Sequence, residues 1–291
     1  MRRIARAVPA PTCCASCACR DVPLNVNLWS VEAGQVAHPL IVLIHGAMDR
    51  SASMLKLSRR LDEQFRVLRY DRRGYGHSLH HPGSFDMAGQ LEDLVGLLKG
   101  RRAVLVGHSY GGNVALAAAT RHRELVAGVV MYEAPLSFES WWPTSTAGAS
   151  VIKAVGQPQS AAEDAAEAFM RRLIGDERWL ALPERTRAIR RSEGPTLVNE
   201  LADLRENRPW IAEDVKVPLL VGFGSRAAEH HRKGMEHVAH SVAGAQLVCL
   251  HESGHSAPTL APDQFRRELI EPLLQRVGAP WSSAASALPP A

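Results

Sequence analysis

Short apolar runs alternate with amphipathic stretches along most of the chain. Continuous runs occur at 40–44, 103–106, 129–132, 218–221 and 247–250, with a more mixed run at 67–70. Such runs are typical of strands buried on both faces of a sheet. Earlier in the chain, Leu24, Val26 and Leu28 alternate with polar residues, which predicts a half-exposed antiparallel strand.

Helical spacing fills several of the gaps between these runs. Apolar residues recur three or four positions apart in three stripes: Met54, Leu57 and Leu61; Met87, Leu91, Leu94 and Leu98; and Phe265, Leu269 and Leu273. The last stripe follows Pro262-Asp263, a plausible helix start, and Pro272 is expected to end or kink that helix. Because a single apolar stripe suits a helix that covers a sheet, the element order predicts βαβ units and a mainly parallel sheet.

The region from 136 to 215 differs, because it carries helix signals without a strand-like run. A capping-box pattern at Ser160-Ala161-Ala162-Glu163 predicts one helix that Gly175 ends, and further helices are predicted after Pro183 and after Gly194-Pro195. We therefore expect an α/β core of 21–135 and 216–277 with a helical lid inserted at 136–215. Four of the six tryptophans lie in or beside this insertion and are candidates to line an apolar pocket, Trp141 and Trp142 first: Trp141, Trp142, Trp179 and Trp210.

Composition excludes several classes of protein. The 291 residues are 46% hydrophobic and 22% charged, as in ordinary globular domains, so a coiled coil or a wholly disordered chain is excluded. The net charge of +4 is spread along the chain, which gives little reason to expect a nucleic-acid partner. No apolar run approaches the roughly 18 to 20 residues that span a bilayer, and no secretory signal is evident, so we expect a cytoplasmic protein. Residues 1–20 are predicted to be a disordered leader and 278–291 a flexible tail.

The cysteines do not predict a metal site. Four of the five are close together near the N-terminus, at Cys13, Cys14, Cys17 and Cys19. A structural zinc site usually takes two pairs separated by a longer loop, so neither a metal nor another cofactor is predicted. Cys249 lies in an apolar run and is predicted to be a small core residue. Nothing in the sequence sets the oligomeric state.

The strongest chemical signal is the segment Gly107-His108-Ser109-Tyr110-Gly111, which joins a predicted buried strand to a predicted helix. It matches the G-x-S-x-G nucleophile elbow, in which a strained turn lifts the serine hydroxyl above the sheet edge and the glycines leave room for the backbone. The following helix aims its N-terminal amides at the place where negative charge develops. Ser109 is therefore the predicted nucleophile.

Three further segments agree with the elbow in order and spacing: 43–47, which contains His-Gly, 70–78, and 251–255, which contains Gly-His. With them, residues 21–277 resemble the α/β-hydrolase superfamily, in particular its lid-bearing esterase and peroxidase-like branch. The resemblance implies an α/β-hydrolase fold with a mostly parallel sheet. It also implies an oxyanion hole formed by the backbone N–H groups of Ala47 and Tyr110.

The same resemblance implies that His255 is the catalytic base, because it follows the last predicted strand and is preceded by Gly254. His251 is its competitor. His108 is expected to lie along the elbow and His45 to pack beneath the oxyanion loop, neither of them transferring protons. The segment 70–78 is expected to be structural.

The third member of the triad is absent from its usual place. In the superfamily an aspartate mostly follows the strand that here ends near Phe223, but no carboxylate occurs before Glu229. In some relatives the acid follows the preceding strand, and here that position holds Glu133. We therefore predict Glu133 as the acid, with Glu229 or a dyad without a carboxylate as the alternatives.

These residues predict a serine hydrolase that cleaves a small to medium, moderately apolar carboxylic ester through an acyl-enzyme on Ser109. Dehalogenases and epoxide hydrolases of this superfamily use an aspartate at the elbow, so Ser109 argues against both. Two alternatives stay open. Peroxide could replace water in a cofactor-free perhydrolase, and a hydrolase-like binding protein could recognise its ligand with only slow turnover.

Overall fold

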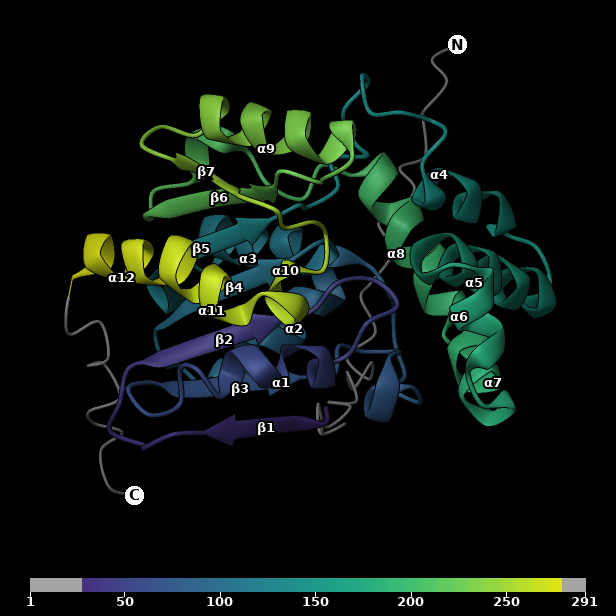
Figure 1. The fold of residues 1–291 in the computed structure, drawn as a ribbon, viewed down its shortest axis with the longest axis horizontal. Helices are drawn as coiled ribbons and strands as arrows, with labels where there is room; N and C mark the ends of the chain where they lie inside the picture. The colour runs from purple at the N-terminus through teal and green to yellow at the C-terminus, as the bar shows by residue number, and fades with distance from the viewer. Residues whose placement is uncertain (1–27, 279–291) are drawn as a thin grey trace, which may run out of the picture.

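A seven-stranded sheet forms the centre of the protein (Figure 1). The computed structural model describes residues 28–278. The strand order is β1-β3-β2-β4-β5-β6-β7; β1 pairs antiparallel with β3 and all other neighbours are parallel. The bounds are β1 (Ser30–Ala33), β2 (Leu40–Ile44), β3 (Arg66–Tyr70), β4 (Ala103–His108), β5 (Val126–Tyr132), β6 (Leu219–Gly224) and β7 (Gln246–Leu250). The predicted mostly parallel α/β architecture is confirmed.

All six apolar runs lie in strands, as predicted, but one of them is not buried on both faces. In β7 only Leu250 is buried, and Cys249 is exposed, so its assignment to the core is wrong. The reason is that β7 is an edge strand with a neighbouring strand, β6, on one side and none on the other, so its residues are less covered than those of the inner strands. The antiparallel strand lies at Ser30–Ala33, whereas residues 24–27 of the predicted strand fall outside the described residues.

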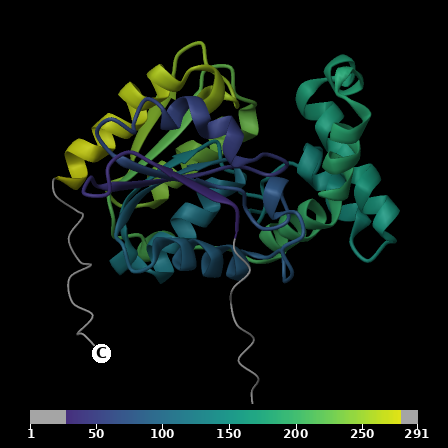
Figure 2. The same cartoon turned by 90° about the horizontal axis from the view of Figure 1, so that it is seen from below.

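Two layers of helices cover the sheet (Figures 1 and 2). One face carries α1 (Leu55–Ser58), α10 (Ala257–Leu260), α11 (Pro262–Phe265) and α12 (Glu271–Val277), and the other carries α2 (Met87–Leu98), α3 (Tyr110–Arg121) and α9 (Glu229–Ser241). Buried side chains divide into two apolar clusters in the same way, one on each face of the sheet. Each predicted stripe therefore faces the sheet.

Two helices differ from the prediction in their detail. The stripe of Met54, Leu57 and Leu61 is buried, but it covers a 3-10 turn and the short α1, because the N–H groups of Arg60 and Leu61 bond three residues back. Pro272 does not end the last helix. It lies in the first turn of α12, which follows a π-helical segment at Arg266–Ile270. The π-helical segment changes the backbone hydrogen-bond pattern just before the proline ring.

Between β5 and β6 the chain forms five α-helices that stand apart from the sheet layers, beyond one end of the strands (Figure 2). They are α4 (Ala147–Val151), α5 (Gln159–Ile174), α6 (Asp176–Ala181), α7 (Glu184–Ser192) and α8 (Gly194–Glu206). The helices α5, α7 and α8 match the three predicted ones; the short α4 and α6 were not predicted. The capping box is wrong, because α5 begins at Gln159 after Pro158 and Ser160 lies inside the helix.

None of the helices within residues 28–278 combines the length and the apolar character that crossing a bilayer requires.

The predicted leader at 1–20, its four cysteines and nearly all of the predicted tail at 278–291 lie outside the described residues.

Candidate active site

Ser109 lies at the sharp turn between β4 and α3. Its backbone has φ 53° and ψ −126°, a left-handed conformation that is strained for a residue other than glycine. The turn is held from below, because the Ser109 N–H donates to the carbonyl of Tyr132 at 2.9 Å. The sequence thus produces the raised, strained position that the elbow motif predicts for a nucleophile.

The two glycines of the elbow are required by close backbone contacts. A Cβ atom on Gly107 would lie 2.3 Å from the carbonyl oxygen of Gly111, and one on Gly111 would lie 2.3 Å from the carbonyl oxygen of Ile44. Both distances are far below van der Waals contact. Any larger residue at either position would therefore displace α3 or β2 from beneath the turn.

His255 and Glu133 meet beside this turn. The Nδ1 atom of His255 lies 2.8 Å from Oε2 of Glu133, a fully buried residue with φ 44° directly after β5. The other carboxylate oxygen, Oε1, accepts the N–H of Gly224 at 2.9 Å. Because an ionised carboxylate only accepts hydrogen bonds, His255 carries its proton on Nδ1 and keeps a free lone pair on Nε2.

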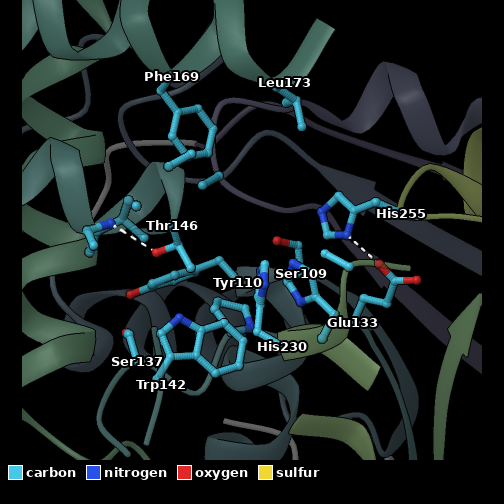
Figure 3. Close-up of a pocket in the computed structure, with 18 of the residues that line it drawn as sticks. Ser109, Tyr110, Glu133, Ser137, Trp142, Thr146, Phe169, Leu173, His230 and His255 are labelled. Carbon is cyan, nitrogen blue, oxygen red and sulfur yellow. Dashed lines mark hydrogen bonds and ion pairs between the residues drawn. The ribbon is translucent and has the colours of Figure 1, made fainter. Parts of the chain in front are cut away.

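Figure 3 shows the Ser109 hydroxyl and the His255 ring on the same side of one cavity, with the dashed bond running from the ring to Glu133. Within residues 28–278 no hydrogen bond joins Ser109 to His255. Bonds between a nucleophile and its base are often long when no substrate is present. The three side chains that sequence reasoning selected are thus brought to one place, although they come from three different strand ends.

The alternative candidates for the acid and the base, Glu229 and His251, lie away from Ser109. Glu229 is the first residue of α9, is exposed, and pairs with Lys233 at 2.7 Å. His251 is exposed directly after β7 and does not line the cavity. Neither residue is in a position to exchange a proton at Ser109.

Two further histidines near the elbow are fixed in the neutral form. His45 accepts the Arg72 N–H at Nε2 and donates from Nδ1 to the Gly46 carbonyl; burial, and then the charge of Arg72, lowers the pKa of His45 to about 3. His108 donates from Nε2 to the His255 carbonyl at 2.8 Å, and burial lowers its pKa well below the usual value. Both are structural, as the sequence resemblance implies.

The candidate oxyanion donors, the N–H groups of Ala47 and Tyr110, belong to residues that line the cavity beside Ser109. Tyr110 is the first residue of α3, so its N–H has no acceptor within the helix. The loop that carries Ala47 is held by the fully buried Arg72, which donates to the carbonyls of His45 and Gly46 at 3.0 Å each.

Arg72 also connects this loop to the helical insertion. Its guanidinium pairs at 2.8 Å with Glu200 of α8, and neither side chain has any exposed surface. Glu200 additionally accepts a hydrogen bond from the Tyr75 hydroxyl. The segment 70–78 is structural, as expected, and fixes the insertion over the oxyanion loop.

A cavity of about 370 Å³ opens above Ser109. We call it the central cavity; apart from Ser109, Glu133 and His255, its walls are mainly apolar and include Trp142, Ile152, Phe169, Leu173 and Leu201. Most of these side chains belong to α5, α8 and the segment that joins them to β5. The insertion therefore forms the roof of the central cavity, and Figure 3 shows Phe169 and Leu173 above the reacting residues.

The family of the chain follows from a comparison with protein-family models. Residues 41–268 match the model of the alpha/beta hydrolase family, a range that includes Ser109, Glu133 and His255. The chain belongs to the alpha/beta hydrolase family.

Relatives within this family differ in their named activities. The chain is 32% identical over 117 residues to epoxide hydrolase 3 of Xenopus tropicalis. This match covers 38% of this chain and 32% of the length of that protein. The structure is similar to that of a thermophilic esterase from Thermogutta terrifontis, with a TM-score of 0.65, 22% identity, and 86% and 93% of the two chains covered. It is also similar to the enol-lactonase from Burkholderia xenovorans LB400, with a TM-score of 0.60, 26% identity, and 82% and 94% covered.

The tryptophans of this alpha/beta hydrolase have different roles. Trp142 is buried and lines the central cavity. Trp141 does not line the central cavity, so its assignment there is wrong. It is 41% exposed, its ring lies against Trp142 and His237, and it lines a neighbouring pocket. Trp179 and Trp210 are buried and do not line the central cavity. Trp179 donates to Glu167 and joins α6 to α5 within the insertion, whereas Trp210 donates to Asn113 of α3 and attaches the insertion to the core.

Trp142→Ala is expected to change the preference for ester chain length more than the turnover of the smallest acetyl ester. A remote apolar wall binds the chain of the substrate and does not touch the reacting carbonyl. The measurement is kcat/KM for 4-nitrophenyl esters from acetate to octanoate. Equal losses across the series would show that Trp142 only supports the fold.

His231 is a site residue that sequence reasoning missed. Its ring stacks on His255 at 4.9 Å between centroids with 26° between the planes, and His108 flanks His255 from another side at 4.6 Å. Burial, followed by the neighbouring His255, lowers the pKa of His231 well below its usual value. No local signal pointed to it, because the contact depends on how α9 packs against the loop after β7.

Among the described residues, Glu133, His231 and His255 bring possible metal-ligating atoms within 4.8 Å of one another. The arrangement fits a triad better than a metal site. Nδ1 of His255 and Oε2 of Glu133 are already joined by a hydrogen bond. The rings of His231 and His255 are nearly parallel, so their nitrogen lone pairs do not converge on one point where an ion could bind.

Proposed function

We propose that this alpha/beta hydrolase is a serine hydrolase that cleaves small to medium carboxylic esters through an acyl-enzyme on Ser109. The observation that carries the proposal is the bond between His255 Nδ1 and Glu133, which leaves Nε2 of His255 as a base beside a serine at the nucleophile elbow. An apolar cavity roofed by the insertion supports a moderately apolar substrate, with 136–215 acting as its lid.

The proposed reaction has two steps. Nε2 of His255 takes the proton of the Ser109 hydroxyl while Ser109 Oγ attacks the ester carbonyl, and the N–H groups of Ala47 and Tyr110 stabilise the oxyanion. Collapse breaks the bond to the alcohol, which leaves with the proton from His255. Water then attacks the acyl-enzyme with His255 again as base, releasing the acid and restoring Ser109. Glu133 remains ionised throughout and stabilises the imidazolium.

The serine also favours an ester over an epoxide as the substrate. An alkoxide that opened an epoxide would leave an ether on Ser109, and water activated by His255 has no carbonyl to attack in an ether. An acyl group on Ser109 keeps a carbonyl and is released. The 26% identical enol-lactonase, a lactonase by name, supports the same choice of bond.

The test is a panel of 4-nitrophenyl esters and one epoxide, styrene oxide, incubated with the native protein. We expect turnover of the esters and no turnover of the epoxide. Diol formation from styrene oxide without hydrolysis of any ester would overturn the proposal.

A further inference from the structure

Building on the proposed serine hydrolase function, we propose that the central cavity takes esters that carry a carboxylate at the far end of an apolar chain. The groups that would bind this carboxylate are the guanidinium groups of Arg205 and Arg172. A substrate of this class is amphipathic, with the ester carbonyl at Ser109 and the anion beneath the insertion.

Both arginines share a helix face with apolar residues of the cavity wall. On α5, Arg172 follows Phe169 by three residues and precedes Leu173, and on α8, Arg205 follows Leu201 by four residues. Residues three or four apart lie on the same side of a helix. The stripes that form the roof therefore also present positive charge to the central cavity.

This positive charge is not neutralised from within the cavity. Among the described residues that line it, Glu133 is the one carboxylate, and both of its oxygens are bonded, to Gly224 and to His255. The Arg205 side chain has no hydrogen-bond or ion-pair partner within residues 28–278. Arg172 donates only to the carbonyl of Ser145, at 2.9 Å.

A third arginine, Arg226, adds positive charge to the central cavity. Arg226 lines the central cavity after β6, and its nearest carboxylate is that of Glu252 at 3.8 Å, with 69% and 71% of the two side chains exposed. A pair this exposed contributes little. The central cavity thus holds three guanidinium groups against one carboxylate that is already engaged in the triad.

An unpartnered guanidinium beside an apolar wall favours an anion. Arg205 is half-buried, so part of its hydration is lost without any compensating protein contact. A carboxylate would supply two parallel charge-assisted hydrogen bonds, a geometry that the planar guanidinium matches. A neutral ester of the same length would leave Arg205 unpaired.

The apolar residues that line the central cavity together with these arginines and Ser109 determine the rest of the substrate. Ile152, Phe169, Leu173 and Leu201 offer no hydrogen-bonding side-chain groups, so they favour a hydrocarbon segment between the carbonyl and the carboxylate. The sequence alone indicated a moderately apolar ester. The structure adds an anionic end to it.

The experiment compares two esters of equal chain length, mono(4-nitrophenyl) adipate and 4-nitrophenyl hexanoate. We expect the native protein to prefer the adipate by at least about tenfold in kcat/KM, and Arg205→Met to reduce this preference by at least about tenfold. Arg205→Lys, which keeps the charge but not the planar fork, should give an intermediate preference. Raising the salt concentration should weaken the preference, because exposed charges are screened.

The matched control is Arg185→Met, the same change at an exposed arginine of α7 outside the central cavity. It should retain the native preference. Equal kcat/KM for the two esters in the native protein would overturn the carboxylate inference while leaving the serine hydrolase proposal intact.

If neither ester is cleaved, the proposed function fails and binding decides the inference separately. Isothermal titration calorimetry on Ser109→Ala would then compare monomethyl adipate with methyl hexanoate. Tighter binding of the adipate, weakened at least about tenfold by adding Arg205→Met, supports the inference. Equal binding of the two esters overturns it.

Discussion

Ser109→Ala is expected to lower ester turnover by on the order of a thousandfold or more while leaving the thermal midpoint nearly unchanged. The substitution removes only the hydroxyl, which has no hydrogen-bond partner among residues 28–278, and keeps the Cβ atom in the strained turn. Folding therefore loses no contact, whereas the reaction loses its nucleophile. The measurement is kcat/KM with 4-nitrophenyl butyrate beside a thermal melt.

The matched control for this prediction is Ser137→Ala, the same change at another serine that lines the central cavity. It should alter turnover by less than about fivefold, because Ser137 is not placed to attack the substrate. Ester turnover at the native level in Ser109→Ala would rule out Ser109 as the nucleophile.

Glu133→Gln is expected to lower ester turnover by at least about a hundredfold with the fold intact. The amide oxygen can still accept the Gly224 N–H and the amide NH2 can donate to Nδ1 of His255, so the buried side chain stays hydrogen-bonded. The amide lacks the charge that stabilises the His255 imidazolium. Its NH2 group also favours the tautomer with the proton on Nε2, which cannot act as a base.

The comparison variant for Glu133 is Glu229→Gln, which should change turnover by less than about threefold. Glu229 is exposed and paired with Lys233, away from His255. The reverse ranking of the two variants would place the acid after β6 and contradict the assignment to Glu133.

Local sequence signals predict the parts of this fold that local physics determines. The continuous apolar runs identify β2, β4, β5 and β6, because a strand buried on both faces admits few polar residues. The mixed run of β3 and the exposed run of β7 also mark strands, although neither strand is wholly buried. Exposure of Cys249 was not predictable from its run, since only the sheet order shows that β7 is an edge. The capping pattern at Ser160 failed for a local reason, because α5 begins directly after Pro158 and Ser160 lies inside the helix.

The candidate site divides in the same way. Ser109 and His255 follow from motifs at strand ends, and Glu133 follows because the carboxyl ends of neighbouring parallel strands meet at one edge. The stacking of His231 on His255 and the gathering of Arg172 with Arg205 depend on how α9, α5 and α8 pack over that edge. Their sequence neighbourhoods resemble ordinary solvated helix faces, so only the tertiary structure distinguishes them.

The most direct test of the central claim is the mass of the protein after reaction with diethyl 4-nitrophenyl phosphate. This reagent transfers a diethylphosphoryl group to activated serines, and the group is hydrolysed from the serine only slowly. We predict a single diethylphosphoryl group on the peptide that contains Ser109, appearing in step with the loss of ester turnover and absent from Ser109→Ala. An adduct at another residue accompanied by loss of turnover, or full turnover of ester by protein labelled at Ser109, would contradict an acyl-enzyme on Ser109.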